Sequence, residues 1–208
     1  EQDYQQWYHG CYQHPEAHAH AISSIPEITG DAVKSAQVIA NPGCYPTSIA
    51  IGLAPALKNG LISKKGIVID SKSGVTGAGR GLTQNTHYPE CNEAFAPYKV
   101  GTHRHTPEIE QMLSELAGEK LTVTFVPHLL PVNRGIVSTI YADLAKEISA
   151  QEIHQIYQQM YGKKQFVRVL KLGDIPNLKN VRYSNYCDDG IFVDDRAKKL
   201  IVVSAIDN

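Results

Sequence analysis

The residue with the clearest chemical potential is a cysteine that stands on a tight turn. Residues 41–47 read NPGCYPT, and they place Cys44 directly before a segment whose apolar residues recur at helical spacing. Residues 36–40, just before this turn, are predicted to form a short buried strand. The free N–H groups at a helix start favour a thiolate, which is the nucleophilic form of cysteine. The pattern predicts a strand-to-helix elbow with a reactive thiol, and the alternative is a buried, inert cysteine.

A pair of histidines supplies the second chemical element. Residues 103–108 read HRHTPE, with Thr106 predicted as the N-cap of a helix and Pro107 at its first position. One imidazole can serve as a general acid or base, and the guanidinium of Arg104 can hold a carboxylate or a phosphate. Taken alone, two histidines spaced in this way are more often structural or metal-binding. Together with the elbow cysteine they favour catalysis.

A glycine-rich loop is the third element. Residues 71–81 read SKSGVTGAGRG and follow a predicted strand at 66–70. Four glycines let backbone N–H groups approach an anion, yet the loop is neither a P-loop nor a complete dinucleotide-binding fingerprint. A purely structural turn is the alternative. Arg80 near the end of the loop favours closure over an anionic group.

The remaining elements predict an α+β fold. The helix after Cys44 ends at Asn59 and Gly60 and contains Pro55, which should bend it. A capping box at residues 149–152 begins another helix. Strands are predicted at 121–126 and 135–144, with Pro127 and Pro131 between them, and an antiparallel set at 166–170, 190–193 and 200–206, with a hairpin turn at 194–197. We therefore expect a mixed, largely antiparallel sheet with helices on one face.

Composition narrows the class of protein. The chain has 208 residues, 42% of them hydrophobic, and a net charge of −1, so it can bury one or two cores and carries no charge signature for nucleic acid. No apolar run approaches the roughly 20 residues that span a membrane, and no signal-peptide pattern opens the chain. We expect a cytoplasmic protein that binds neither nucleic acid nor membrane.

Cysteine and histidine spacing gives no indication of a metal. The four cysteines are far apart and form no C-x-x-C pair, which excludes the usual zinc motifs and a dense disulfide framework. The histidines near the start of the chain are interpreted as surface or packing residues. The residues concerned are Cys11, Cys44, Cys91 and Cys187, and His9, His14, His18 and His20.

Four segments together resemble the N-acetyl-gamma-glutamyl-phosphate reductase family of arginine biosynthesis, a relative of the aspartate-semialdehyde and glyceraldehyde-3-phosphate dehydrogenases. They are residues 41–47, 71–80, 103–111 and 127–131, in the order in which that family has them. The resemblance covers nearly the whole chain. It implies a fold like the C-terminal domain of glyceraldehyde-3-phosphate dehydrogenase, and a homo-oligomer, either dimer or tetramer.

The resemblance also implies an activity. It is the NADPH-dependent reduction of a small acyl phosphate, N-acetyl-gamma-glutamyl phosphate, to N-acetylglutamate semialdehyde with release of phosphate. Cys44 would form a thioester that is then reduced. His105 is the first choice for the general acid and base, and His103 is the alternative or a substrate contact.

Binding residues carry over from the same resemblance. Arg80, Arg104 and Arg134 are candidates to hold the phosphate or the α-carboxylate of the substrate. Ser73, Gly74 and Asn41 are candidates to contact NADP. Asn133 departs from the family pattern, because a threonine is expected in the run before Arg134 and Gly135.

The domain division follows from what the family places around these motifs. Residues 1–43 are expected to be the trailing end of a dinucleotide-binding domain whose remainder is absent, and residues 44–208 the catalytic and dimerisation domain. We expect this chain alone to bind NADPH weakly or not at all. Two alternatives stay open: a cysteine hydrolase or acyltransferase that uses Cys44 and His105, and a non-catalytic dimerisation or binding module.

Overall fold

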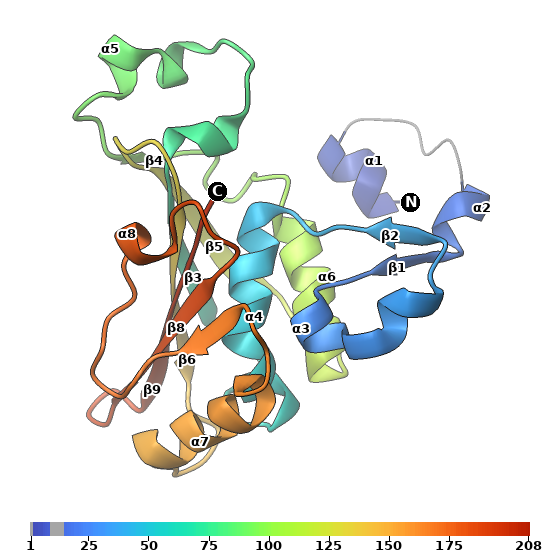
Figure 1. Ribbon diagram of the computed structural model, residues 1–208, viewed down its shortest axis with the longest axis vertical. Coiled ribbons are helices and arrows are strands. Elements are labelled where there is room, and N and C mark those ends of the chain that lie inside the picture. The colour runs from blue at the N-terminus through green and yellow to red at the C-terminus, as the bar shows by residue number, and fades with distance from the viewer. Residues whose placement is uncertain (1, 9–14) are drawn as a thin grey trace.

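A seven-stranded mixed sheet forms the centre of the molecule. The computed structural model, drawn in Figure 1, describes residues 2–8 and 15–208. The strands of the large sheet lie in the order β4-β5-β3-β6-β9-β8-β7. The pairs β3–β5 and β7–β8 are parallel, and the other four are antiparallel. The predicted mixed, largely antiparallel sheet is confirmed. The strands are β3 (Ile67–Ser73), β4 (Ala96–Pro97), β5 (Val123–Leu129), β6 (Ile136–Asp143), β7 (Val167–Val169), β8 (Cys187–Asp194) and β9 (Lys199–Ile206).

Three helices cover one face of this sheet. They are α4 (Cys44–Lys58), α6 (Thr106–Ala117) and α7 (Ala150–Tyr161), the last begun by the predicted capping box at Ser149. Side chains alternate along β6, and its buried positions pack under α4. The hydrophobic core therefore lies between α4 and the sheet. The shorter helices are α1 (Gln2–Tyr8), α2 (Pro15–His18), α3 (Pro26–Thr29), α5 (Tyr88–Cys91) and α8 (Leu178–Val181).

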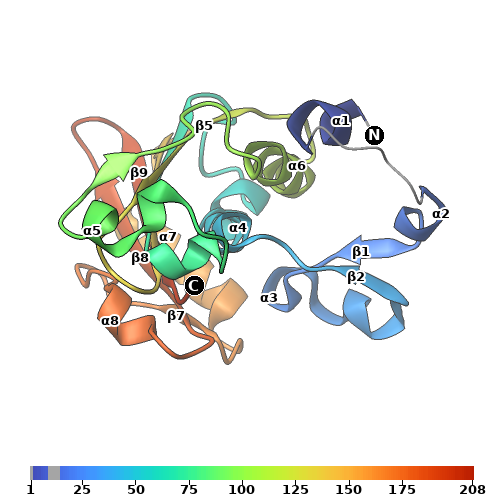
Figure 2. The same cartoon turned by 90° about the horizontal axis from the view of Figure 1, so that it is seen from above.

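A separate two-stranded parallel sheet precedes the elbow at Cys44. It consists of β1 (Ala21–Ser23) and β2 (Val38–Ala40), and it lies on the side of α4 away from the large sheet (Figure 2). The prediction of a buried strand at 36–40 was wrong about burial, since Val38 and Ile39 are 44% and 51% exposed. The strand forms as expected, but its side chains lie outside the core.

Two further strand predictions were wrong in detail. Pro127 lies inside β5 and does not separate two strands; the missing N–H is tolerated because the two-residue β4 is the neighbour on that side. The strand predicted at 166–170 is β7, and it runs parallel to β8. Periodicity identifies a strand but does not give its direction.

Two tyrosine hydroxyls of α7 hydrogen-bond to backbone carbonyls of α4 near Pro55. Proline has no N–H, so the carbonyl of Ile51, four residues earlier, loses its helical donor. The hydroxyl of Tyr161 donates to this oxygen at 2.7 Å, and Tyr157 donates to the carbonyl of Gly52 at 2.6 Å. Both rings are fully buried. The carbonyl of Ile51, which Pro55 leaves without a helical donor, therefore has a hydrogen-bond donor in Tyr161 of α7.

We predict that Tyr161→Phe destabilises the chain by about 1–3 kcal/mol, because it leaves the buried carbonyl of Ile51 without a donor. In a Pro55→Ala background the helix regains its own N–H, and the same substitution should cost less than about 1 kcal/mol. Chemical denaturation of the wild type, the two single variants and the double variant measures the coupling between Tyr161 and Pro55. Tyr157→Phe is the matched control, since Gly52 keeps a helical donor from Ala56; equal coupling of both tyrosines to Pro55 would contradict the assignment.

A buried carboxyl group lies on β8. Asp189 is fully buried; its Oδ1 accepts a hydrogen bond from Cys187 Sγ at 3.6 Å, and its Oδ2 meets no hydrogen-bond partner within the described part of the chain. Burial raises the pKa of Asp189 from 3.8 to about 7. At mildly acidic pH this side chain is therefore a neutral carboxylic acid in the folded protein.

We predict that the Asp189 carboxyl lowers stability as pH rises from about 4 to about 7. In this window the folded chain keeps a proton on Asp189 that the unfolded chain has lost, so the contribution of Asp189 to the unfolding free energy decreases with pH and levels off above the folded pKa. This contribution is on the order of 4 kcal/mol, and it opposes that of His103 and His105, whose folded pKa values are lowered to about 4. Urea denaturation at several pH values should show that the stability of the wild type, measured relative to Asp189→Asn, falls across this window. Asp174→Asn, at an exposed position, is the control, and an unchanged slope in Asp189→Asn would refute the prediction.

Candidate active site

The elbow predicted around Cys44 is confirmed. Helix α4 begins at Cys44, and Gly43 is its N-cap residue in extended conformation. Thr47 secures the first turn, because its backbone N–H and its hydroxyl both donate to the carbonyl of Gly43, at 3.0 and 2.9 Å. Cys44 itself is half-buried. Its thiol therefore lies at the N-terminus of a helix that is anchored on the large sheet.

The N-terminus of α6 lies against the same elbow. A Cβ atom added to Gly43 would lie 2.7 Å from His105 Nε2, so glycine is required for the imidazole to come this close. The N-cap of α6 is His105, whereas Thr106 was predicted; the hydroxyl of Thr106 is buried in the first turn without a hydrogen-bond partner among the described residues. This arrangement brings the His105 ring beside the residue that precedes Cys44.

Glu108 joins the two helix starts directly. Its Oε1 accepts the backbone N–H of Gly43 at 2.9 Å. Sequence reasoning assigned no role to this residue, although it belongs to the motif at 103–111. Its place three residues after the N-cap, in the first turn of α6, is a signal that could have identified it.

His103 occupies a different environment from His105. It is almost fully buried, and its Nδ1 accepts the backbone N–H of His105 at 3.1 Å. In the neutral ring the proton therefore lies on Nε2. The rings of Tyr45, Tyr98 and Phe125 surround it at centroid distances of 5.4 to 5.6 Å. His103 consequently supports the turn that presents His105.

The electrostatics of the site favour uncharged groups. Burial raises the pKa of the Cys44 thiol, and the nearby Glu108 carboxylate raises it further, against the lowering effect of backbone N–H groups and Arg104. The N–H groups at the helix start lower the pKa, as expected of groups that favour a thiolate, but desolvation outweighs them. Burial lowers the pKa of both His105 and His103 to about 4. The resting pair is a thiol and a neutral imidazole.

The three candidate arginines lie in different settings. Arg104 is exposed, and its charge acts on Cys44, His105 and Glu108. Arg80 is exposed on the glycine-rich loop. Arg134 makes a bidentate ion pair with Asp207, at 2.7 to 3.2 Å, and lies over the ring of Tyr183. Of the three, Arg104 is the arginine whose charge acts on the pKa of Cys44.

The candidate cofactor residues also separate. Ser73 is buried beside Tyr45: burial raises the pKa of the Tyr45 hydroxyl, and Ser73 offsets a small part of this, which places Ser73 near the elbow. Gly74 is packed against the backbone of 133–134, since an added Cβ would lie 2.8 Å from Arg134 N. Asn41 is exposed at the entry to the elbow. Gly74 is thus packed against backbone, Ser73 is buried with its hydroxyl bonded to Gly74 O and Asn208 Nδ2, and Asn41 is the exposed one of the three.

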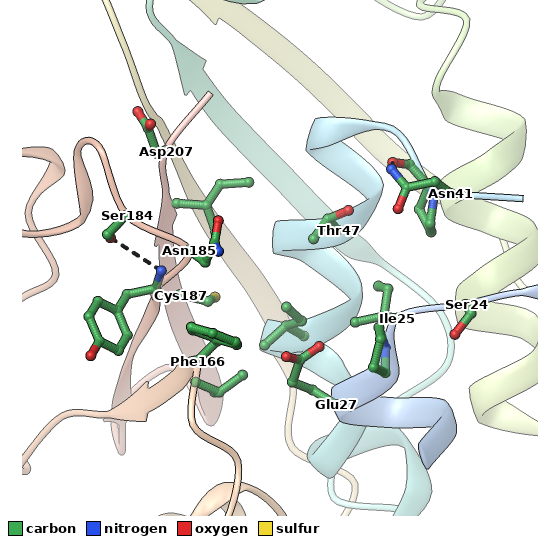
Figure 3. Close-up of a pocket in the computed structure, with 16 residues that line it drawn as sticks. Ser24, Ile25, Glu27, Asn41, Thr47, Phe166, Ser184, Asn185, Cys187 and Asp207 are labelled. Atoms are coloured by element: carbon green, nitrogen blue, oxygen red, sulfur yellow. Dashed lines mark hydrogen bonds between the residues drawn. The ribbon is translucent and has the colours of Figure 1, made fainter. Parts of the chain in front are cut away.

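A cavity of about 240 Å³ opens next to the elbow, between α4 and the C-terminal segments (Figure 3). Asn41 and Ile25 line one wall, and Phe166, Ser184 and Asn185 line the opposite one. The carboxylates of Glu27 and Asp207 also line this cavity, whereas Cys44 and His105 do not, so the lining combines amide, hydroxyl and carboxylate groups with apolar side chains.

Three of the four cysteines lie within the described residues. Cys44, Cys91 and Cys187 are free thiols, whereas Cys11, His9 and His14 lie outside the described residues. Within residues 2–8 and 15–208, no group of three or more histidine, cysteine or acidic side chains is arranged to hold a metal ion. The helices described in these ranges include none that is long and apolar enough to cross a membrane.

Comparison with known proteins gives a consistent result. Residues 44–208 match the family model described as semialdehyde dehydrogenase, dimerisation domain. The whole chain is 59% identical to the N-acetyl-gamma-glutamyl-phosphate reductase of Brachyspira hyodysenteriae and 53% identical to that of Clostridium botulinum. The chain covers 61% and 60% of these two relatives, so it spans about three fifths of their length.

Solved structures resemble the chain at the level of the fold. Aspartate semialdehyde dehydrogenase II from Vibrio cholerae superposes with a TM-score of 0.72 at 15% identity, over 91% of this chain and 64% of that one. The enzyme from Francisella tularensis gives a TM-score of 0.69 at 11% identity, over 90% of this chain and 66% of that one. The predicted α+β architecture is thus shared with these dehydrogenases.

Proposed function

Because the chain belongs to the semialdehyde dehydrogenase family, we propose that it is the catalytic and dimerisation part of an NADPH-dependent N-acetyl-gamma-glutamyl-phosphate reductase. One observation carries this proposal: Cys44 begins a helix, and the residue before it, Gly43, is contacted by both the imidazole of His105 and the carboxylate of Glu108. A nucleophile next to a neutral base is the arrangement that acyl transfer requires. The identity of 59% to a relative of that name supports the choice of substrate.

The residues divide the acyl-transfer step between them. Cys44 Sγ attacks the acyl carbon of the acyl phosphate, its proton passes to neutral His105, and the carbon–oxygen bond to phosphate breaks. The products are a thioester on Cys44 and inorganic phosphate. The low pKa of His105 keeps its imidazole unprotonated at neutral pH, so its nitrogen is free to accept this proton, although the same burial makes it a weaker base.

The second half of the reaction uses the same two side chains. The reduced nicotinamide, when bound, supplies hydride to the thioester carbon. Cys44 then leaves as the carbon–sulfur bond breaks, and the proton held on His105 returns to sulfur. The aldehyde product is N-acetylglutamate semialdehyde.

Arg104 is our first choice for the anionic group of the substrate. Its charge already acts on Cys44 and His105, and a guanidinium can bind a carboxylate or phosphate with two parallel hydrogen bonds. Arg80, on its exposed loop, is the second choice. Arg134 is paired with Asp207, and we assign it to holding the loop before β6 against the end of the chain.

The cavity beside the elbow is our candidate for the nicotinamide end of NADP. Asn41 and Asn185 can hydrogen-bond a carboxamide, Ser184 adds a hydroxyl, and Ile25 and Phe166 offer an apolar surface to the ring. Ser73 is a further contact on the other side of Tyr45. We propose that residues 1–43 belong to a dinucleotide-binding domain and that the catalytic and dimerisation domain begins at Cys44, where the family match also begins.

A second copy of the chain is the proposed partner of the open face of the large sheet. Four side chains lie in register across adjacent strands on the face away from α4, and Val68 at one end is exposed. Such an apolar row is typical of an isologous interface. The four residues are Val68, Tyr141, Phe192 and Ile201.

We predict that Tyr141→Glu converts the dimer to a monomer, because it places two buried charges at the centre of that interface. Sedimentation velocity at micromolar concentration measures the change in mass. Tyr183→Glu, at a strongly exposed tyrosine elsewhere, should leave the dimer intact. A dimer that survives Tyr141→Glu would place the interface on another face.

The decisive test of the activity is the reverse reaction. The full-length gene product should oxidise N-acetylglutamate semialdehyde and form NADPH only when inorganic phosphate is present. A folded protein that forms no NADPH, but hydrolyses acyl phosphates without nucleotide, would overturn the reductase in favour of a cysteine hydrolase. A folded protein with neither activity would favour a non-catalytic dimerisation module.

A further inference from the structure

Three buried hydroxyl groups connect the catalytic helix to the centre of the sheet. They belong to Ser48 on α4, Ser138 on β6 and Ser71 on β3, and all three residues are fully buried. Ser138 Oγ lies 2.7 Å from Ser48 Oγ and 2.7 Å from Ser71 Oγ. The result is a polar link across an otherwise apolar helix–sheet contact.

The donors of this link can be assigned in one direction. Ser48 Oγ donates to the carbonyl of Tyr45 at 3.3 Å, so it must accept from Ser138. Ser138 in turn must accept from Ser71. The chain of hydrogen bonds therefore runs from the sheet, through Ser138 and Ser48, to a carbonyl in the first turn of α4. Each hydroxyl gives its single proton to the next group.

The two tyrosine hydroxyls that hold α4 further along come from α7 and not from the sheet, and the contact between α4 and the sheet near Gly52 is made by side-chain packing. At Gly52 the helix lies close to the sheet, with 3.3 to 3.4 Å between an added Cβ and the side chains of Val202, Ile140 and Ser204. Small and aliphatic contacts tolerate sliding and repacking, whereas a fully satisfied polar network selects one arrangement.

The polar link ends next to the nucleophile. Ser48 follows Cys44 by four residues and so lies one turn below it on the same side of the helix. Tyr45, whose carbonyl accepts the last hydrogen bond, follows Cys44 directly. On the other side Glu108 holds the N–H of Gly43. Cys44 is thus fixed from both of its sequence neighbours.

We infer that Ser138 is a positioning residue for Cys44: through Ser48 it sets the depth and rotation of the first turn of α4, and thereby the access and orientation of the thiol. This inference rests on the proposed role of Cys44 as the nucleophile. It does not depend on the identity of the substrate or of the cofactor.

The test compares single alanine variants in the network. Ser48→Ala cuts the link between helix and sheet at a helical position that suits alanine, and Ser138 can then bond to Ser71 alone. Ser71→Ala is the matched control: it is equally buried and part of the same network, but it leaves the bond between Ser138 and Ser48 intact. Ser138→Ala removes both bonds.

The primary readout is the rate at which iodoacetamide alkylates Cys44, followed by peptide mass spectrometry from pH 6 to 10. We expect Ser48→Ala and Ser138→Ala to change this rate at least about fivefold, or to displace its pH midpoint, and Ser71→Ala to match the wild type. In the full-length protein Ser48→Ala should lower kcat about tenfold with little change in KM.

Each outcome decides the question. If Cys44 in folded Ser48→Ala is alkylated at the wild-type rate, the serine link has only a structural role and the inference is overturned. Failure of Ser48→Ala to fold, with Ser71→Ala folded, overturns it as well, because the link would then support the fold itself. A changed alkylation rate without phosphate-dependent reductase activity in the full-length wild type leaves the inference standing and removes the proposed function.

Discussion

Replacement of Cys44 by alanine should reduce phosphate-dependent formation of NADPH by the full-length protein by roughly 10⁴-fold or more. In the proposed mechanism the thiol forms the covalent bond on which both half-reactions depend, and loss of the nucleophile removes that route completely. Stability should change little, because Cys44 is only half-buried at a helix start. The measurement is kcat in the direction of semialdehyde oxidation.

Cys91→Ala provides the matched control for this experiment. Cys91 is a buried free cysteine on α5, and its thiol makes only weak contacts with backbone carbonyls, at 3.7 and 3.8 Å. This variant should keep wild-type kcat. If Cys44→Ala retained activity within about tenfold of the wild type, covalent catalysis at this residue would be excluded.

The second large effect concerns the imidazole at the elbow. His105→Asn should lower kcat/KM by about 10²–10⁴-fold, the usual contribution of a positioned general base. His154→Asn, which removes an imidazole that contacts the carbonyl of Leu170, should leave activity unchanged. His103→Asn should act mainly on stability, since that ring supports the turn.

The pH dependence separates His105 from an ordinary histidine. Its pKa is lowered to about 4, so the base form persists as pH falls and the acid limb of kcat/KM should lie near pH 4 to 5. An unburied histidine would place that limb near its usual pKa of about 6.5. A limb near 6.5 in the wild type would show that another group, or a reorganised site, controls the reaction.

Sequence reasoning was most successful where structure is local. The elbow at Cys44, the helix stop at Gly60 and the capping box at Ser149 each depend on residues within a single turn. Strand positions were also predicted closely, because alternation of side chains is a short-range signal. The mixed sheet followed from these elements together.

Features that depend on contacts distant in the sequence were missed. Glu108 acts on a residue 65 positions earlier, and nothing in its own neighbourhood specifies that partner. The pairing of Arg134 with Asp207 spans 73 positions, and no local signal in the sequence indicates it. The parallel direction of β7 is likewise a property of the assembled sheet.

Electrostatics showed the same limit. The N–H groups around Cys44 were identified correctly, but the sign of the net effect on its pKa depends on how much of the thiol is desolvated. Burial is a tertiary quantity, and the same limit explains the error about β2. Site residue types could be predicted from sequence, whereas their protonation states could not.

The raised pKa of Cys44 has a consequence for damage to the protein in a cell. Peroxides attack the thiolate, so a cysteine that rests as a thiol is converted to sulfenic acid slowly. In the proposed mechanism His105 takes the proton as Cys44 attacks the acyl carbon, so the thiolate would arise during turnover and not between cycles. Burial at this elbow would then protect the proposed nucleophile from peroxides while it waits for substrate.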